Sequence, residues 1–357
     1  MSGSIGVLGG AGTVGRIAVE RLRGFGLPVL VGGRDLTRAE EVARAAAAAA
    51  APVDLFDDSS LAAFCAGCSV VLNCAGPSYR VLDRVARAAL DAGAGYVDAA
   101  GDLVAVEALT RHPPDGLARR AAVFSAGLMP GLSGLLPRLL LDGTPVARLD
   151  VYVGGSVEIS EASAVDALLT RGPKFGHALA MWRAGQVAPH ALAPLRSITL
   201  PGFHGRVHAV PFLSTEMIAL ASGAGLAELR NYTVYATDNL PRALATAWAD
   251  DNRPPEAHAA AIVRAARLDV EAHGRHYAVL AYARPPAGSG RTPRRVLLRT
   301  PDSYPLSGVV AALATRQVAA GAVAPGAHYA SEALDPEAVA KELAGDPLVS
   351  ELALPSR

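Results

Sequence analysis

The sequence predicts an α/β fold in which a doubly wound Rossmann domain is joined to a second α+β domain with a mixed sheet. Helix and strand patterns alternate through the first third of the chain, and a GxGxxG motif separates the first strand from the first helix. From about Leu149 strand patterns dominate, several of them alternating. A chain of 357 residues also exceeds what one hydrophobic core usually organises, so two domains are expected.

Residues 5–34 form the first unit of the pattern. An apolar strand is followed by Gly10-Ala-Gly-Thr-Val-Gly and by an amphipathic helix. In such a loop the first glycine permits the tight turn, the second lets the backbone approach a pyrophosphate, and the third allows close packing of helix on strand. The helix N-terminus offers free N–H groups to phosphates. These features predict a dinucleotide site formed by Gly10, Gly12, Thr13, Val14 and Gly15.

The second strand, 29–31, ends in Gly32-Gly33-Arg34. An NAD-specific site usually has a carboxylate there for the ribose 2′-hydroxyl, and Asp35 comes one residue late for that role. The planar guanidinium of Arg34 suits a 2′-phosphate, which predicts NADP. The alternative is that Arg34 only stacks on the adenine, and either cofactor would allow that.

The following elements continue the alternation. Thr37 and Glu40 have capping-box spacing and predict a helix that runs through the alanines 45–51 and ends before Pro52. The further predicted elements are strands at 53–56, 70–73, 96–97 and 122–124 and a helix at 81–92. Right-handed crossovers place the carboxyl ends of such strands at one edge, where a ligand binds.

The second domain is predicted from its strands and two internal helices. The strands are 150–154, 197–201, 206–210, 231–235 and 276–280, the helices are 162–182 and 254–268, and two more helices follow at 307–320 and 335–343.

Composition excludes several classes of protein. Acidic and basic residues balance at 33 each, and no basic stripe with interleaved aromatics occurs, so nucleic acid is not an expected partner. The first strand begins by residue 5, which leaves no room for a signal peptide, and the longest uncharged run, 121–137, is broken by glycines and prolines. We therefore expect a cytoplasmic protein without membrane contact.

No metal site is predicted. Cys65 and Cys68 form a CxxC without a second pair or a nearby histidine, which favours small buried residues over a zinc or redox site. The histidine pairs 204/208 and 273/276 have suitable spacings but lack cysteine or carboxylate ligands nearby.

Four motifs resemble the saccharopine dehydrogenase family. They are GGAGTVG followed by GGR, VVLNCAGP followed by GYVDAAGD, GLMPGLSGLL, and SYPLSGVVAALATRQVAAGAVAPG. The resemblance spans nearly the whole chain and is loosest over 151–299. It implies an NAD(P)-binding Rossmann domain at 1–126 completed by C-terminal helices at about 300–357, and a substrate domain at 127–299 that carries a homodimer interface.

The resemblance also implies hydride transfer on a carbon–nitrogen bond. It places Ala75, Gly76 and Pro77 along the cofactor near the nicotinamide, and the GxxPG loop beside the substrate. Family members that act on amino acids often have an acidic residue before the proline of this loop, whereas this chain has Met129 before Pro130. Because methionine offers an adaptable apolar wall, we expect a weakly charged substrate, free or bound to a carrier, rather than saccharopine.

The proton donor has several candidates. Tyr79 follows Pro77 by two residues and can donate from its phenol, or can serve only for packing. Asp98 and Asp102 flank the loop after the fifth strand, where they can hold the nicotinamide ribose or a cationic substrate, or can cap the next helix.

The second domain offers a further set of candidate side chains. On the predicted helix, Lys174 and His177 share one face and can move a proton or bind a substrate anion, although a solvated face is the alternative. Glu158, Glu161 and Trp182 are the candidate substrate-binding side chains there.

The sequence thus predicts an NADP-dependent oxidoreductase of the imine reductase type. Two alternatives remain, namely reduction of a polarised carbon–carbon double bond, which the apolar Met129 also fits, and a sensor or scaffold that binds NADP without turnover.

Overall fold

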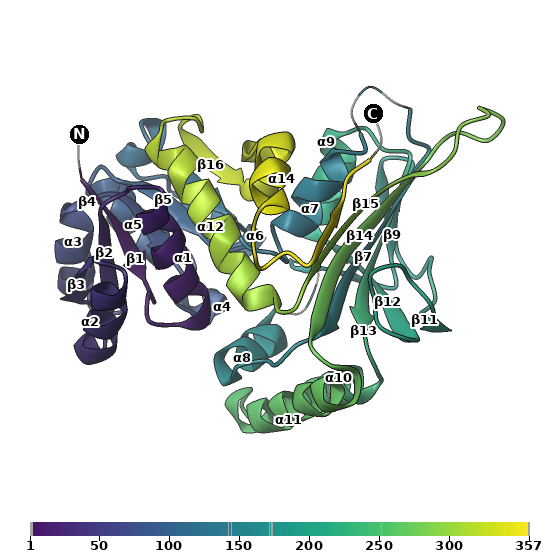
Figure 1. The fold of residues 1–357 in the computed structure, drawn as a ribbon, viewed down its shortest axis with the longest axis horizontal. Helices are drawn as coiled ribbons and strands as arrows, with labels where there is room; N and C mark the ends of the chain where they lie inside the picture. Colours follow the sequence, from purple (N-terminus) through teal and green to yellow (C-terminus); the bar gives the residue numbers. More distant parts are fainter. Residues whose placement is uncertain are drawn as a thin grey trace. The chain divides into compact units, whose positions relative to one another are not determined.

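The computed structural model describes residues 3–141, 143, 145–170, 172, 174–250 and 252–355. The chain forms two compact units (Figure 1). Unit 1 consists of Met1–Leu132 and Tyr304–Asp335, and unit 2 of Ser133–Ser303 and Pro336–Arg357. The C-terminal segment is therefore divided between the units at residue 335.

A seven-stranded, wholly parallel sheet organises unit 1, in the order β16-β6-β5-β4-β1-β2-β3. The order reverses at β1, so that β4 and β2 flank it, as in a doubly wound nucleotide-binding sheet. The strands are β1 (Ser4–Leu8), β2 (Val29–Gly33), β3 (Ala49–Pro52), β4 (Cys68–Asn73), β5 (Gly95–Asp98), β6 (Ala121–Phe124) and β16 (Gly326–Tyr329).

Helices cover both sides of this sheet (Figure 1). They are α1 (Thr13–Gly24), α2 (Leu36–Ala45), α3 (Asp58–Ala66), α4 (Ser78–Val81), α5 (Arg84–Asp91), α6 (Leu103–Arg111), α12 (Ser303–Ala319) and α13 (Ala330–Ala333), with a 3₁₀ turn at Asp115–Ala118. Gly308 of α12 faces α1 so closely that a Cβ there would lie 2.5 Å from the carbonyl oxygen of Val14. The C-terminal segment 304–335 thus completes unit 1 by packing on its first helix.

The predicted helix through the alanine run is wrong. α2 ends at Ala45, Ala47 has a φ of +51°, and Ala49–Pro52 forms β3 beside β2, where the sequence predicted a strand at 53–56. The cap was also misassigned, because Asp35, not Thr37, accepts the Arg38 N–H at 3.1 Å. The predicted helix 81–92 is interrupted between α4 and α5.

Unit 2 is built on a mixed sheet, as predicted. Its main path runs β10-β9-β13-β7-β14-β15-β17, and β12 joins β13, β11 and β8. Only the β13–β7 pairing is parallel among the strand pairs described. The strands are β7 (Arg148–Ser156), β8 (Gly176–Ala178), β9 (Met181–Arg183), β10 (Gln186–Ala188), β11 (Leu195–Ile198), β12 (Val207–Ser214), β13 (Glu228–Tyr235), β14 (His276–Arg284), β15 (Arg294–Thr300) and β17 (Glu351–Ala353).

The helices of unit 2 are α7 (Leu132–Arg138), α8 (Glu161–Leu169), α9 (Thr215–Gly223), α10 (Asn239–Trp248), α11 (Glu256–His273) and α14 (Pro336–Ala344). The predicted helix 162–182 is wrong beyond Leu169, because β8 and β9 occupy its second half. A Cβ on Gly176, at φ +152°, would lie 2.6 Å from the Leu213 carbonyl oxygen, so β8 approaches β12 through a glycine. In the described part of the chain no helix is long and apolar enough to cross a membrane.

Candidate functional site

The glycine loop of unit 1 connects β1 to α1 as the motif requires. A Cβ on Gly10 would lie 2.7 Å from Val31 Cγ1, and one on Gly15 would lie 2.3 Å from the Gly9 carbonyl oxygen. Gly12 is different, because its Cβ position meets only the Gly9 oxygen at 3.2 Å and is otherwise open. No side chain caps α1, so its first-turn N–H groups face the open side of this loop and suit a phosphate.

Replacing Gly15 by alanine is expected to cost about 2 kcal/mol of stability through overpacking. The added methyl group would push α1 away from β1 and so weaken dinucleotide binding. Denaturant unfolding checks the stability, and the matched control is Gly24→Ala in the same helix, whose Cβ would meet no atom within 4 Å. Equal midpoints for the two variants would contradict the close packing of Gly15.

The tip of β2 carries exposed cations, and its nearest carboxylate caps the helix that follows. Arg34 is exposed, and Asp35 uses its carboxylate to cap α2. Arg38, in the first turn of α2, is also exposed. The local charge at this tip therefore favours a phosphate over a ribose hydroxyl.

A buried carboxylate joins the next two loops at the carboxyl edge of the sheet. Asp98, the last residue of β5, is 2% exposed. It accepts hydrogen bonds from Tyr96 Oη at 2.5 Å, Asn73 Nδ2 at 3.1 Å, and the backbone N–H groups of Ala100 at 2.9 Å and Gly101 at 2.7 Å. The side chain predicted to contact a ligand thus points into the protein and fixes the loops that form the edge.

The partners of Asp98 extend this network. Asn73 Oδ1 accepts from the Ala75 N–H at 3.1 Å, and Ser125 Oγ donates to the Gly101 carbonyl at 2.7 Å. Burial, followed by the charge of Asp98, raises the pKa of Tyr96 well above its usual value, so its phenol remains a donor. The loops after β4, β5 and β6 are consequently held in one framework.

The candidate proton donors of unit 1 differ in placement. Tyr79 lies in α4, just after the cis Gly76-Pro77 bond, and its side chain is 40% exposed. Asp102 is the N-cap of α6 and accepts the Val104 N–H at 3.1 Å. Asp102 therefore has the capping role that was the alternative at the sequence level.

The GxxPG loop closes on itself at the same edge. Gly127 and Gly131 form a parallel bridge, and a Cβ on Gly131, at φ +128°, would lie 2.1 Å from the Gly127 oxygen. Ser307 Oγ of α12 accepts the Leu128 N–H at 3.1 Å. Met129 is 48% exposed, followed by the half-buried Pro130, so this fixed loop presents an apolar side chain to its surroundings.

The candidates of unit 2 do not share one helix face. Lys174 is exposed in a turn, and His177 is half-buried on β8 opposite Leu213. Glu161 is exposed as the first residue of α8. The spacing argument for a Lys–His pair therefore fails, although each side chain keeps its own chemistry.

The remaining candidates of unit 2 have structural partners. Glu158 Oε1 pairs with Arg275 Nη2 at 2.5 Å. Trp182 is 8% exposed, and its indole N–H donates to the Leu226 carbonyl at 2.9 Å, which is the placement of a core residue.

The cysteines are free, and Cys65 and Cys68 are buried. Burial raises the pKa of Cys65 to about 12 and that of Cys68 to about 11, so both thiols stay protonated. Their placement agrees with the interpretation as small buried residues.

Three residues of the edge had no predicted role: Asn73, Tyr96 and Ser307. The sequence held a signal for the first two. Asn73 ends an apolar strand, and Tyr96 stands two residues before Asp98 in a buried strand. Polar side chains in such buried positions need hydrogen-bond partners. Ser307 accepts a hydrogen bond from the Leu128 N–H, which is 179 positions away in the sequence. No local sequence pattern indicates a bond over that separation.

Comparisons with known proteins support the resemblance. Residues 5–127 match the family described as the saccharopine dehydrogenase NADP binding domain, and no curated protein sequence matches the chain. Apo saccharopine dehydrogenase (L-Glu forming) from Saccharomyces cerevisiae is similar in structure, with a TM-score of 0.68 and 15% identity over 97% of this chain and 98% of that one. UDP-N-acetylglucosamine 3-dehydrogenase from Acidithiobacillus ferrooxidans aligns at a TM-score of 0.41 and 13% identity over 90% and 95% of the chains, a likeness too low to carry an argument.

These matches confirm two predictions. The Rossmann fold with a second mixed-sheet domain is that of the yeast enzyme, and the family matched by residues 5–127 binds NADP.

Proposed function

Because residues 5–127 belong to the saccharopine dehydrogenase NADP-binding domain family, we propose that the protein is an oxidoreductase that uses NADPH to reduce a carbon–nitrogen double bond, or runs the reverse on an amine. In the reductive direction the carbon receives a hydride and the nitrogen a proton, which leaves an amine and NADP⁺. The substrate is a weakly charged biosynthetic intermediate. The homodimer and the cytoplasmic location remain predictions from the sequence.

The observation that supports this proposal most strongly is the pair of features at the β1 and β2 ends. The glycine loop leaves the backbone at Gly12 open for a pyrophosphate. At the end of β2, Arg34 is exposed while the nearest carboxylate, Asp35, is bonded to the α2 backbone. The first feature fits the pyrophosphate of either dinucleotide, and the second fits a 2′-phosphate better than a free ribose hydroxyl.

The chemistry then requires alignment, exclusion of water and a proton. When bound, the nicotinamide supplies the hydride. Under this proposal the Ala75–Pro77 loop, held by Asn73, supports the nicotinamide end, and the Met129 loop forms an apolar wall for the substrate. Tyr79, exposed next to Pro77, is our candidate for the proton donor. Lys174 and His177 remain second candidates from unit 2.

The Arg34→Ala variant is expected to bind NADPH at least tenfold more weakly, with NADH binding little changed. A tenfold loss corresponds to about 1.4 kcal/mol, a modest value for a charge-assisted contact to phosphate. The measurement is a titration of the protein with each nucleotide, followed by nicotinamide emission and quenching of the two tryptophans.

Arg44→Ala is the matched control, since Arg44 is an exposed arginine at the other end of α2. If both variants lose affinity equally, the effect is general electrostatics and the role of Arg34 is wrong. If wild type binds neither nucleotide, the oxidoreductase proposal itself fails.

Reaction type is tested separately with NADPH-saturated protein. Cyclic imines and mixtures of small aldehydes with amines are offered in one series, and α,β-unsaturated ketones in another, while NADPH absorbance is followed. Turnover confined to the first series supports the proposal. Turnover confined to the second would assign the enzyme to carbon–carbon double bonds, and tight NADPH binding with no turnover in either would favour a sensor or scaffold.

A further inference from the structure

One end of the unit 2 sheet carries an array of arginine side chains on one face. The strand register places them in two adjacent rows across five neighbouring strands, β9, β13, β7, β14 and β15. Residues that pair across neighbouring strands present their side chains on the same face of a sheet. We call the charged residues of these two rows the arginine face; they are Arg148, Arg183, Arg230, Arg284, Arg295, Asp150 and Glu228.

Ion pairs join most of these side chains into one network. Asp150 is 2% exposed and pairs with Arg284 Nε at 2.6 Å and with Arg148 Nε at 3.0 Å. Glu228 Oε1 pairs with Arg230 Nη2 at 2.6 Å and lies 4.0 Å from Arg148 Nη1. Three guanidinium groups are thereby held against the sheet, so they lose less conformational freedom when a partner binds.

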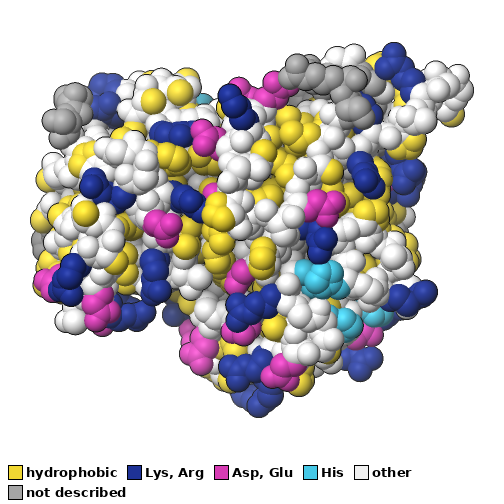
Figure 2. Space-filling view, in the orientation of Figure 1, with side chains coloured by type: hydrophobic (Ala, Val, Ile, Leu, Met, Phe, Trp, Pro, Cys, Tyr) yellow, Lys and Arg dark blue, Asp and Glu magenta, His cyan; other side chains and the backbone are white. Residues whose placement is uncertain are grey.

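The arginine face has an excess of positive charge in a chain whose formal net charge is zero. Its arginines outnumber its two carboxylates, and Arg183 and Arg295, near the two ends of the rows, are exposed. The hairpin between β14 and β15 continues this excess, because residues 284–295 contain four arginines and no acidic residue. Figure 2 shows dark blue side chains at this hairpin, which projects beyond β14 and β15 in Figure 1. A partner that docks here therefore needs negative charge.

Tyrosine rings border the arginines. Tyr282 lies in the second row, and the guanidinium of Arg284 is 5.8 Å from the centroid of its ring. One row further along the strands, Tyr152 and Tyr232 stack on each other, with centroids 4.9 Å apart and an interplanar angle of 8°. Arginine and tyrosine are two of the residue types that dominate the binding energy of protein–protein interfaces. The composition of this surface is therefore that of a protein interface.

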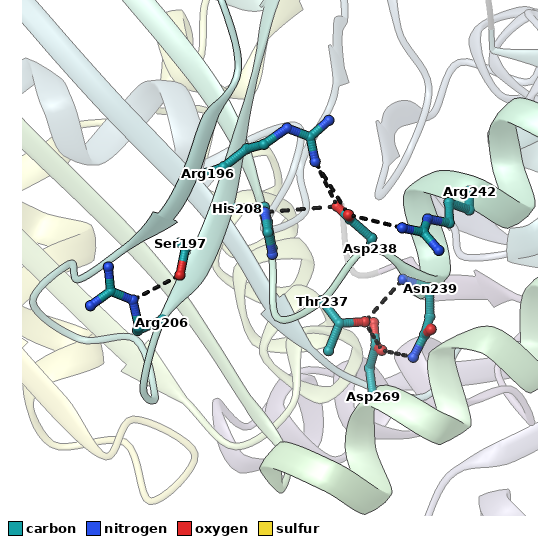
Figure 3. A network of polar contacts seen from close by, with 9 residues as sticks. All are labelled: Arg196, Ser197, Arg206, His208, Thr237, Asp238, Asn239, Arg242 and Asp269. Carbon is teal, nitrogen blue, oxygen red and sulfur yellow. Dashed lines mark hydrogen bonds and ion pairs between the residues drawn. The ribbon is translucent and has the colours of Figure 1, made fainter.

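Another group of arginines in unit 2 lacks these properties (Figure 3). Arg196 and Arg242 both pair with Asp238, at 3.2 and 3.5 Å, and the network drawn there contains no tyrosine. Their side chains are 67% and 80% exposed, whereas the three paired arginines of the arginine face are 27–42% exposed. The group around Asp238 is therefore a solvated surface, and the arginine face is the more rigid of the two.

From this combination of charge, rigidity and aromatic rings we propose that the arginine face docks an acidic segment of another protein. Carboxylates of the segment pair with the exposed arginines of the rows, and its backbone packs on the half-buried rings of Tyr152 and Tyr282. Two copies of the arginine face would bring like charges together, which opposes a second copy of this chain as the partner. A nucleic acid is opposed by Glu228, whose carboxylate would face the phosphates, and by the stacking of Tyr152 on Tyr232, which occupies ring faces that bases would use. This surface is independent of the proposed oxidoreductase function.

The test is a fluorescence anisotropy titration of fluorescein-labelled deca-glutamate with the full chain. The peptide is longer than the rows of the arginine face, which extend for roughly 20 Å over five strands. We expect saturable binding with a Kd on the order of 100 µM in about 100 mM salt, and at least tenfold weaker binding of labelled deca-serine. The proposal is overturned if deca-glutamate does not bind saturably or if deca-serine binds equally well.

The double variant Arg183→Glu/Arg295→Glu is expected to weaken the binding of deca-glutamate at least tenfold. Arg264→Glu/Arg267→Glu is the matched control, because it changes the net charge by the same amount at exposed positions of α11 and should change the Kd by less than twofold. Equal losses in the two variants would show general electrostatics and refute a specific surface. All four arginines are exposed, so both variants should fold, and circular dichroism checks that they do.

Two more measurements separate the acidic segment from other partners. Single-stranded decathymidylate carries a similar number of negative charges, and we expect it to bind more weakly than deca-glutamate. Tighter binding of the oligonucleotide that is lost in Arg183→Glu/Arg295→Glu would assign the surface to nucleic acid and overturn the proposal. Sedimentation velocity should give the same oligomeric state for wild type and this variant, whereas a wild-type dimer that dissociates in the variant would assign the surface to a second copy.

Discussion

Replacing Asp98 by alanine is expected to lower the free energy of unfolding by about 4 kcal/mol, because the change leaves several buried donors unpaired. The variant would orphan the phenol of Tyr96, the amide of Asn73 and two backbone N–H groups, all of which now donate to one carboxylate. A methyl group at this position offers none of them an acceptor. The loss should therefore exceed that of any exposed aspartate by far.

The conservative variant distinguishes charge from hydrogen bonding. In Asp98→Asn the new carbonyl oxygen can still accept the N–H groups of Ala100 and Gly101, while the new amide group meets the Asn73 amide, which is also a donor. An intermediate loss of about 2 kcal/mol is expected. Both variants should also weaken NADPH binding, since Asp98 holds the loops on either side of the proposed nicotinamide position.

Urea unfolding followed by circular dichroism measures the stability, and nucleotide titration measures the binding. Asp91→Ala is the control, because Asp91 is exposed at the end of α5 and should change stability by less than about 0.5 kcal/mol. Unfolding midpoints that coincide for Asp98→Ala and Asp91→Ala would show that the buried network does not stabilise unit 1.

The role of Asp98 also shows what the sequence could indicate about the site. Its place at the end of β5 was predictable, because a carboxylate there follows a short buried strand. Its direction was not, since the donors that turn it inward come from β4, from β5 and from the loop that follows. Sequence patterns locate residues on the edge of a sheet, whereas the partner of each side chain depends on the neighbouring strands.

The fold was predictable where periodicity and glycine chemistry agreed. The β1–α1–β2 segment has both, and its elements lie where the pattern indicates. The alanine run 45–51 has neither an apolar periodicity nor a glycine that would mark a turn. Its only local signal is the preference of alanine for a helix. The backbone nevertheless turns at Ala47 and Ala49–Pro52 pairs with β2, so hydrogen bonding to the sheet outweighs the local preference.

The segment containing Lys174 and His177 held a signal that the helix prediction passed over. Gly172 and Gly176 are four residues apart, and glycine is unfavourable in a helix interior by about 1 kcal/mol. Both have positive φ in the structure, and Gly176 lies against β12 where a side chain would clash. Counting these glycines against the helix would have ended it near Leu169.

Acidification is expected to destabilise the protein through His276, by about 3 kcal/mol once the pH falls below 4. Burial, followed by the neighbouring His204, lowers the pKa of His276 from 6.5 to about 4. The unfolded chain then binds a proton at this residue as the pH falls through 6.5, while the folded protein binds it only near 4. The contribution of His276 to stability is therefore complete above pH 6.5 and is lost progressively as the pH falls toward 4.

The geometry around His276 explains why the proton is unfavourable. Its Nδ1 lies 3.2 Å from the Gly274 carbonyl oxygen and so carries the hydrogen, which leaves Nε2 to accept the His204 N–H at 3.5 Å. A proton on Nε2 would face that N–H donor. The His276 ring also stacks on His204 at a centroid distance of 4.0 Å. His273 and Arg299 lie close enough that their charges oppose a positive charge on the His276 ring.

Replacing His276 by glutamine should flatten the pH dependence between 6.5 and 4, because glutamine does not titrate. The measurement is the free energy of unfolding in urea at several pH values for wild type and variant, and the difference between the two curves isolates His276 from the carboxylates. His190→Gln, at an exposed histidine, should leave the wild-type slope unchanged. A variant that keeps the full wild-type slope would mean that His276 is protonated in the folded protein near its ordinary pKa, and that its two ring contacts do not hold the neutral form.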